Sequence, residues 1–408
     1  VAQKARTAPK PYSCTYGGVV DGHPRAAGLE GFVQQVTEDL WVAIKKQCPP
    51  ADGPIPRASS GLGRAQAAFQ STHCQAFSGR ASPLRQLLQF AYGALPKVQS
   101  SVLVLLGDPG TGKSALLCRL AATMASVQGG LVRPFAHYIG AGPGSSSAVS
   151  VLYSLADAMC RAFELPVELA QDLPQLTAQF AGVLKSVASL APVLLVLDNL
   201  DGLGGADLPV LRTIIPNQPP ENVRIVASCT PRSPAWAALK DRHCQPFSLK
   251  LPPLEPTERE GLVGAVLSQF QQRLTGQHPA DQGGKKKASK TPSQMAALIR
   301  KSEAGKPLYL RQAVEYLRMV GTYETLLDHI RALPPTVDGL MNLTLPTVEL
   351  TATPEAAAAV LPLIMAASPI GGIREADLRD VSGVPVHRVC MLLHVMGTLL
   401  PTSGEEAT

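Results

Sequence analysis

Several features that mark secreted, metal-knuckle or RNA-binding chains are scarce in this sequence. Its eight cysteines include no Cys-x-x-Cys pair, which argues against a zinc knuckle and a disulfide framework and favours a reducing, intracellular compartment, cytoplasmic or nuclear. Aromatic residues make up 5% of the chain, and no aromatic-rich RNA-binding motif is visible. The formal charge of +6 is modest for 408 residues, so it permits an acidic partner without requiring one.

Long uninterrupted hydrophobic runs are also missing. The most apolar late stretch, AAAAVLPLIMAASPIGGI over residues 356–373, contains Pro362 and Pro369, and a packed helix followed by a turn explains it better than a membrane span. No secretory signal is visible and the first residue is valine, so we expect an excerpt of a longer protein. The sequence predicts no membrane partner.

What the sequence does contain is a phosphate-binding pattern. Residues 103–117, LVLLGDPGTGKSALL, combine a strand-like apolar run, a glycine-rich loop and the start of a helix. In this pattern the loop N–H groups hold phosphate, Lys113 reaches the β- and γ-phosphates, and the Ser114 hydroxyl binds Mg²⁺. The density of matches disfavours a merely structural glycine turn. The predicted nucleotide-binding residues are Gly107, Asp108, Pro109, Gly110, Thr111, Gly112, Lys113, Ser114 and Ala115.

A second buried run supplies the carboxylate that such a loop needs for its metal ion. Residues 192–203 read PVLLVLDNLDGL, and Asp198 follows the expected strand 193–197. An acid at the carboxyl end of a strand beside the loop can hold Mg²⁺ through water. Ser114 and Asp198 are therefore the predicted metal ligands.

The acids available for hydrolysis are few. Asp201 is predicted to position the attacking water, or alternatively to cap a turn before Gly202. Asn199 and Gly202 occupy places where hydrolytic versions of this site commonly carry another acid. The sequence therefore predicts at most a slow ATPase, with Asp201 and Lys113 as its catalytic residues.

The identity of the base follows from an absence. Guanine-specific enzymes of this class normally carry Asn-Lys-x-Asp on a later strand, and this sequence contains no such tetrad. Elimination therefore favours adenine, so the expected cofactors are ATP or ADP together with Mg²⁺.

Strand and helix patterns alternate through the middle of the chain, which predicts a doubly wound parallel sheet with its ligand at the carboxyl ends of the strands. After Pro252 the pattern becomes helical. Helices are expected at 256–274, 292–303, 306–320 and 322–332, with a basic loop at 278–290 between the first two. The expected strands are 102–106, 135–139, 193–197, 223–229 and 247–251.

Four segments carry a family resemblance: GDPGTGKS, LLVLDNLDGL, VRIVASCT and AGKPLYLRQAVEYL, in this order. They resemble the NACHT branch of the signal-transduction ATPases with numerous domains. In that family a Gly-x-Pro motif packs its proline on the adenine ring, which implies that Pro307 binds nucleotide. The alternative is an ordinary proline in the first turn of a helix. The family also places a sensor arginine for the γ-phosphate after the fourth strand, where Thr230 and Arg232 are the candidates. The alternative for Arg232 is an ordinary surface cation.

A narrower resemblance covers roughly residues 28–345. GLEGFVQQVTEDLW before the sheet and residues 302–337 after it resemble telomerase- and vault-associated ribonucleoprotein subunits of this superfamily. In those proteins an RNA-binding module precedes this region and WD repeats follow it, so any RNA contact is expected outside this chain. The superfamily also implies a winged-helix-like tail.

The fold class is therefore predicted as α/β, a P-loop NTPase sheet followed by an all-helical domain and a winged-helix-like segment. The predicted divisions are a polar lead at 1–28, a helical extension at 29–98, the P-loop NTPase (NACHT) domain at 99–252, the helical domain at 253–345 and the winged-helix-like segment at 346–408, which we expect to be truncated.

Three functions fit these features. The favoured one is a slow nucleotide-dependent switch or assembly scaffold, with protein partners in a larger ribonucleoprotein and the nucleotide held between the sheet and Pro307. The second is an active oligomeric ATPase motor, which would need an arginine from a neighbour. The third is an RNA-binding subunit that uses Lys285, Lys286 and Lys287.

Overall fold

The computed structural model describes residues 15–20, 23–28, 34, 38, 61–75, 77–96, 98–127, 130–142, 144–242, 244–275, 293–320, 325–367 and 372–396. These residues belong to two compact units, 1–59 and 60–408. The basic loop at 278–290 lies outside the described residues, as does nearly all of residues 29–60 of the predicted helical extension.

The first unit contains a small antiparallel sheet. Strand β1 (Thr15–Val20) pairs with β2 (His23–Ala27), and the register shifts between Tyr16 and Val19. The polar, glycine-bearing composition of residues 1–28 did not predict these strands.

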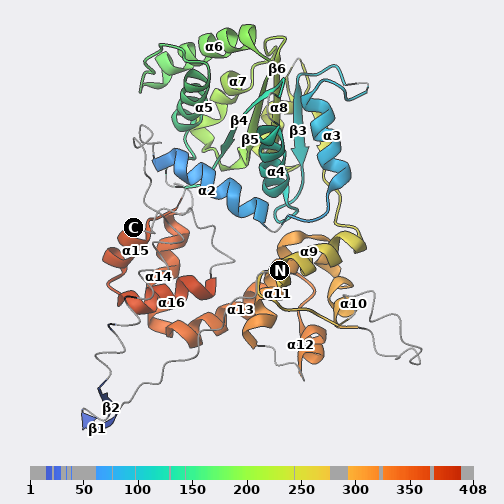
Figure 1. The fold of residues 1–408 in the computed structure, drawn as a ribbon. Coiled ribbons are helices and arrows are strands. Elements are labelled where there is room, and N and C mark those ends of the chain that lie inside the picture. The colour runs from blue at the N-terminus through green and yellow to red at the C-terminus, as the bar shows by residue number, and fades with distance from the viewer. Residues whose placement is uncertain are drawn as a thin grey trace. The chain divides into compact units, whose positions relative to one another are not determined.

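The second unit is built on a parallel sheet of five strands in the order β4-β5-β6-β3-β7 (Figure 1). The strand β6 thus lies between the strand that precedes the phosphate loop, β3, and the strand that ends in Asp198, β5. The predicted strands are confirmed, with ends that differ by at most two residues. Their bounds are Val102–Leu106 for β3, Arg133–Tyr138 for β4, Val193–Asp198 for β5, Val223–Cys229 for β6 and Phe247–Lys250 for β7.

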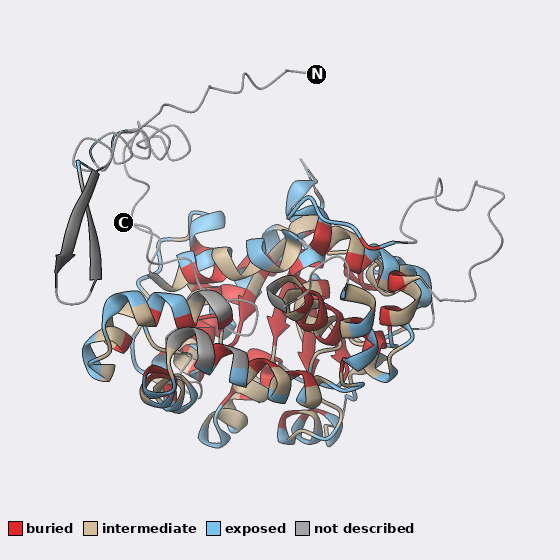
Figure 2. Cartoon of the chain, turned by 90° about the horizontal axis from the view of Figure 1, so that it is seen from below, coloured by how far each residue is buried: buried red, intermediate tan, exposed pale blue. Residues whose placement is uncertain are grey.

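Strand β3 contributes to a separate core on each face of the sheet. Val104 packs with α5 (Ala148–Ala162), α6 (Leu173–Leu190) and α8 (Pro234–Lys240), whereas Leu103 packs with α3 (Ala81–Ala91) and α4 (Lys113–Ser126). Successive side chains of a strand point to opposite faces, so an uninterrupted apolar run is what a sheet covered on both sides requires. Buried residues accordingly concentrate on the strands in Figure 2. Three short elements complete this region: η1 (Leu200–Gly202), η2 (Gly205–Val210) and α7 (Leu211–Ile214).

The helix α2 (Gly61–Gln75) packs beside α4 and β4. The Gln66 side chain, which is buried, accepts a hydrogen bond from the Tyr138 N–H at 2.6 Å and donates one to the Tyr138 carbonyl at 2.9 Å. These two bonds satisfy the outer backbone edge of β4 at this residue, because β4 is the edge strand of the sheet. They also hold the N-terminal half of α2 near the carboxyl end of β4.

After the sheet the described residues are helical. α9 (Pro256–Ser268), α10 (Gln294–Ile299), η4 (Ser302–Gly305), α11 (Pro307–Val320) and α12 (Leu326–Ala332) share one hydrophobic core, called the helical region here. A glutamate pair, Glu255 and Glu258, forms the capping box that starts α9. None of the helices that the structure describes is long and apolar enough to cross a bilayer.

The helix α13 (Val337–Ala352) was not predicted from the sequence, since Gly339 and Pro346 interrupt its pattern. It contributes Leu340 to the core of the helical region and Val348 to a second core, so it connects both. The second core also contains α14 (Pro354–Ala367), α15 (Glu375–Ser382) and α16 (Val386–Met396). The described part of residues 346–396 contains no strand, so a winged-helix fold is not shown, and the predicted domain boundaries remain predictions.

Candidate functional site

The phosphate loop joins β3 directly to α4, as its pattern requires. Gly110 and Gly112 have positive φ angles of +78° and +90°, a backbone region that other residues adopt only at a cost. Space restricts both positions as well. A Cβ atom on Gly110 would lie 2.9 Å from the Leu308 Cβ, and one on Gly112 would lie 3.2 Å from the Pro307 Cγ. Both glycines therefore allow the first turn of α11 to approach the loop.

Hydrogen bonds inside the loop involve carbonyl groups. The Lys113 Nζ donates to the Gly107 carbonyl at 2.6 Å and to the Asp108 carbonyl at 3.4 Å. The Thr111 hydroxyl donates to the same Asp108 carbonyl at 2.7 Å. Because Lys113 bonds only to neutral carbonyls, its positive charge can be offered to a phosphate group.

Asp198 lies at the carboxyl end of β5 and is 1% exposed. The Ser228 hydroxyl donates to its Oδ1 at 2.6 Å, and the Asn199 N–H donates to that hydroxyl at 2.8 Å. Oδ2 is buried and has no hydrogen-bond partner among the described residues. An orphaned, buried carboxylate oxygen is costly unless a ligand or ion completes it.

Burial raises the pKa of Asp198, and the hydroxyls of Ser114 and Ser228, followed by the charges of His73 and Lys113, act in the opposite direction. A divalent cation beside the carboxylate would favour the ionised form further. The donor set fits Mg²⁺, which takes few protein oxygens and fills its shell with water and phosphate oxygens. Nowhere in the described ranges do three or more His, Cys, Asp and Glu side chains form an all-protein metal cluster.

Asp201 lies in η1 beside the same edge of the sheet. Its Oδ2 accepts the Thr230 N–H at 2.6 Å, while its Oδ1 is buried without a hydrogen bond among the described residues. The side chain thus bonds to the end of β6 rather than to Gly202, whose N–H donates to the Asn199 carbonyl at 2.9 Å. The role of Asp201 toward water stays a prediction.

The structure explains why Asn199 and Gly202 occupy the two positions where hydrolytic sites commonly carry an acid. Asn199 adopts a left-handed conformation with φ +59°, and its Nδ2 donates to the Ile139 carbonyl at 3.1 Å. A Cβ on Gly202 would lie 2.9 Å from that Nδ2 and 3.0 Å from the Ile139 Cγ2. A larger residue at Gly202 would therefore displace its neighbours.

Pro307 begins α11 and lies against Gly112, while the Leu308 N–H donates to the Gly110 carbonyl at 3.3 Å. The structure thus brings the Gly-x-Pro segment to the phosphate loop itself. Arg232, which the family resemblance offered as a sensor arginine, has an exposed side chain.

Arg80 was not singled out by the sequence. It is 3% exposed, has φ +60°, and donates from its guanidinium to the carbonyls of Pro252 and, at 3.0 Å, of Thr111. Its N–H also donates to Glu258 of α9. Burial lowers the pKa of this guanidinium, and Glu258 raises it. Arg80 thus ties the phosphate loop to α9 and to the linker, residues 251–255, between β7 and α9. A lone arginine before a helix gives no sequence signal for this role.

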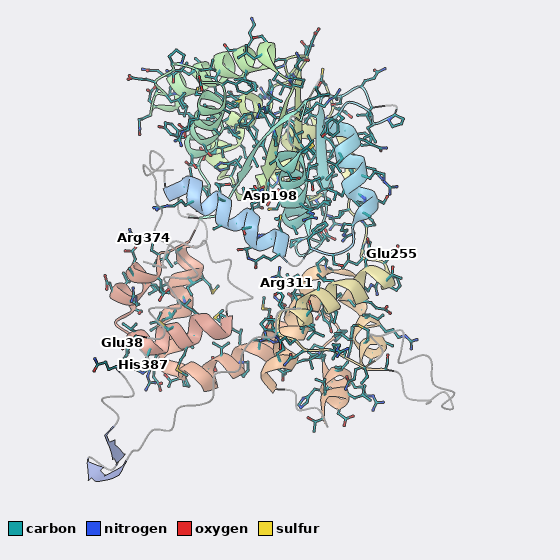
Figure 3. All side chains as sticks on the ribbon, viewed as in Figure 1. Glu38, Asp198, Glu255, Arg311, Arg374 and His387 are labelled. Carbon is teal, nitrogen blue, oxygen red and sulfur yellow. The ribbon has the colours of Figure 1, made fainter. Side chains whose placement is uncertain are left out.

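His73, near the end of α2, was also not singled out by the sequence. Its Nδ1 lies 2.9 Å from the Phe69 carbonyl, and burial is the main cause that lowers its pKa. The charge of Asp198 raises this pKa and the charge of Arg311 lowers it, so both charges act on the imidazole. Figure 3 shows Asp198 at the sheet and Arg311 on α11. The edge of the site thus combines residues from α2, β5 and α11.

Parts of this chain are similar to known proteins. Residues 101–269 match the family model of the NACHT domain. The chain is 29% identical over 348 residues to telomerase protein component 1 of Rattus norvegicus, covering 83% of this chain and 13% of the relative. It is 33% identical over 165 residues to the NACHT domain- and WD repeat-containing protein 1 of Homo sapiens, and this match covers 38% of this chain and 10% of the relative. A solved structure, Cdc6p from Pyrobaculum aerophilum, matches at 12% identity and a TM-score of 0.39, covering 80% of this chain and 89% of that one.

Proposed function

We propose that this chain, whose residues 101–269 form a NACHT domain, is a slow nucleotide-dependent switch that serves a larger assembly. ATP or ADP, with Mg²⁺, would bind between the phosphate loop and the first turn of α11. The nucleotide state would then determine how the helical region is held against the sheet domain.

One observation carries this proposal: the first turn of α11 rests on the two glycines that shape the phosphate loop. Leu308 contacts Gly110 through a backbone hydrogen bond, and Pro307 lies against Gly112. Any change in the loop on nucleotide binding therefore acts directly on α11. A ligand at about 1,000 times its dissociation constant stabilises the state that it binds by about 4 kcal/mol, enough to bias domain packing.

Each residue proposed to hold the nucleotide would contact a different part of it or of its metal ion. Loop N–H groups bind the phosphates, Lys113 neutralises them, and Ser114 with Asp198 would hold Mg²⁺, the latter through water. Mg²⁺ would neutralise charge on the phosphates. The Pro307 ring offers a flat apolar surface for adenine. Asp201 would orient water for slow hydrolysis.

The larger assembly is inferred from the relatives. The chain spans only about an eighth of telomerase protein component 1, at 13% of its length, so RNA and protein contacts of a whole protein would involve regions outside this chain. We propose a telomerase- or vault-type ribonucleoprotein in the cytoplasm or nucleus as its setting. A winged-helix character of the tail and attached WD repeats belong to the same proposal.

The Pro307→Ala variant tests the role of the α11 turn. We expect it to weaken ATP and ADP binding about tenfold, because the ring lies against Gly112 and would pack on the adenine. The Mg²⁺ dependence of binding should stay as in the wild type, since Ser114 and Asp198 are untouched. Isothermal titration calorimetry with and without Mg²⁺ measures both quantities.

Pro334→Ala is a suitable control, because this half-buried proline lies between α12 and α13 and not in the turn of α11 that meets the loop. Undiminished affinity in Pro307→Ala would contradict the placement of the nucleotide against α11. Turnover that is fast and rises with protein concentration would instead favour an oligomeric motor.

A further inference from the structure

A half-buried cation without an ion pair among the described residues, Arg311, lies one helical turn from the contact between α11 and the phosphate loop. Arg311 is one helical turn after Pro307, so both side chains share the face of α11 that meets the loop. Its guanidinium makes no ion pair and no hydrogen bond with any residue that the structure describes. The next arginine on the helix, Arg318, is by contrast paired with Glu315.

The charge of Arg311 acts at the metal-binding edge of the sheet domain. Arg311 and Asp198 both shift the pKa of His73, in opposite directions. Ser114 and Lys113 in turn lower the pKa of Asp198. Lys113 of α4 and Arg311 of α11 therefore both act on the edge that holds the carboxylates of Asp198 and Asp201. Two cations from separate helices, one of them without an ion pair among the described residues, are suited to a polyanion in a partly buried site.

Arg80, the buried arginine at the loop, cannot bind a polyanion in the same way. The Arg80 guanidinium is already bonded to the carbonyls of Thr111 and Pro252. Arg311 is free to turn toward a ligand, and an arginine gives phosphate oxygens charge-assisted hydrogen bonds of defined direction.

We propose that Arg311 contacts the terminal phosphate of the bound nucleotide and thereby distinguishes a nucleoside triphosphate from a diphosphate. The inference rests on the proposed function and adds the residue that reads the nucleotide state. The loop N–H groups and Pro307 would contact parts common to ATP and ADP, and Lys113 would contact both the β- and γ-phosphates, whereas Arg311 would contact only the phosphate that differs. Loss of that phosphate then removes an electrostatic connection between α11 and the loop.

The test measures binding of a non-hydrolysable ATP analogue and of ADP, both with Mg²⁺, to the whole chain and to Arg311→Gln. We expect the analogue to bind about tenfold more weakly or worse, and ADP affinity to change by less than about twofold. Arg311→Lys should keep part of the preference, because it retains the charge without the planar fork. Arg300→Gln, an exposed arginine of the same region, is the matched control and should change neither affinity.

The possible outcomes separate the two proposals. Equal losses for both nucleotides, or no loss in Arg311→Gln with an unchanged melting temperature, would overturn the role of Arg311 and leave the switch intact. A wild-type chain that binds neither nucleotide would overturn the proposed function, and the role of Arg311 with it.

Discussion

Lys113→Ala is expected to abolish measurable nucleotide binding while the protein remains folded. The ammonium would make two charge-assisted hydrogen bonds to the β- and γ-phosphates, each of about 1.5–3 kcal/mol, so affinity should fall about 100-fold or more. In the structure Lys113 bonds only to the carbonyls of Gly107 and Asp108, at the edge of the loop. Its loss should therefore cost little stability. Calorimetric titration with ATP and ADP measures the affinity, and circular dichroism follows folding.

Lys240→Ala serves as the control, because Lys240 is an exposed lysine at the end of α8. Its nucleotide affinity should equal that of the wild type. Unaltered ATP affinity in Lys113→Ala would remove the assignment of the phosphate loop.

Arg80→Met is expected to lower the free energy of unfolding by about 3 kcal/mol. The variant keeps the backbone N–H that bonds to Glu258 but leaves the carbonyls of Thr111 and Pro252 without their donor. An unsatisfied buried carbonyl costs about 1–3 kcal/mol. Since Thr111 belongs to the phosphate loop, nucleotide affinity should fall as well. Urea unfolding followed by circular dichroism gives the stability.

Two further variants serve as a control and as a conservative replacement. Arg85→Met, an exposed arginine on the same helix α3, should change stability by less than about 0.5 kcal/mol. Arg80→Lys can reach one carbonyl at a time and should be intermediate. A stability of Arg80→Met equal to that of the wild type would show that the buried guanidinium does not hold the loop and the linker together.

Local sequence patterns predicted the elements whose chemistry is contained in a short segment. The apolar strands, the glycine loop and the strand that ends in Asp198 are such segments, because a strand buried on both faces and a phosphate loop each dictate their own residue types. Resemblance then pointed to Pro307, which the structure places against Gly112.

What the sequence did not predict depends on contacts between distant segments. Arg80 and Thr111 meet across 31 positions, and Ser228 and Asp198 across 30, so neither pairing has a local signal. The helix α13 was missed because Pro346 lies inside it. Tertiary packing overrides the low helix propensity of that residue, which composition alone does not reveal.

Amide hydrogen exchange of the whole chain tests the central claim most directly. Peptides from residues 107–117 and 305–320 would be followed without nucleotide, with ADP and Mg²⁺, and with a non-hydrolysable ATP analogue and Mg²⁺. The account predicts that nucleotide protects both segments together, because α11 rests on Gly110 and Gly112, and that ADP and the analogue give different protection in 305–320. Protection confined to 107–117 and identical for both nucleotides would contradict a switch that acts through α11.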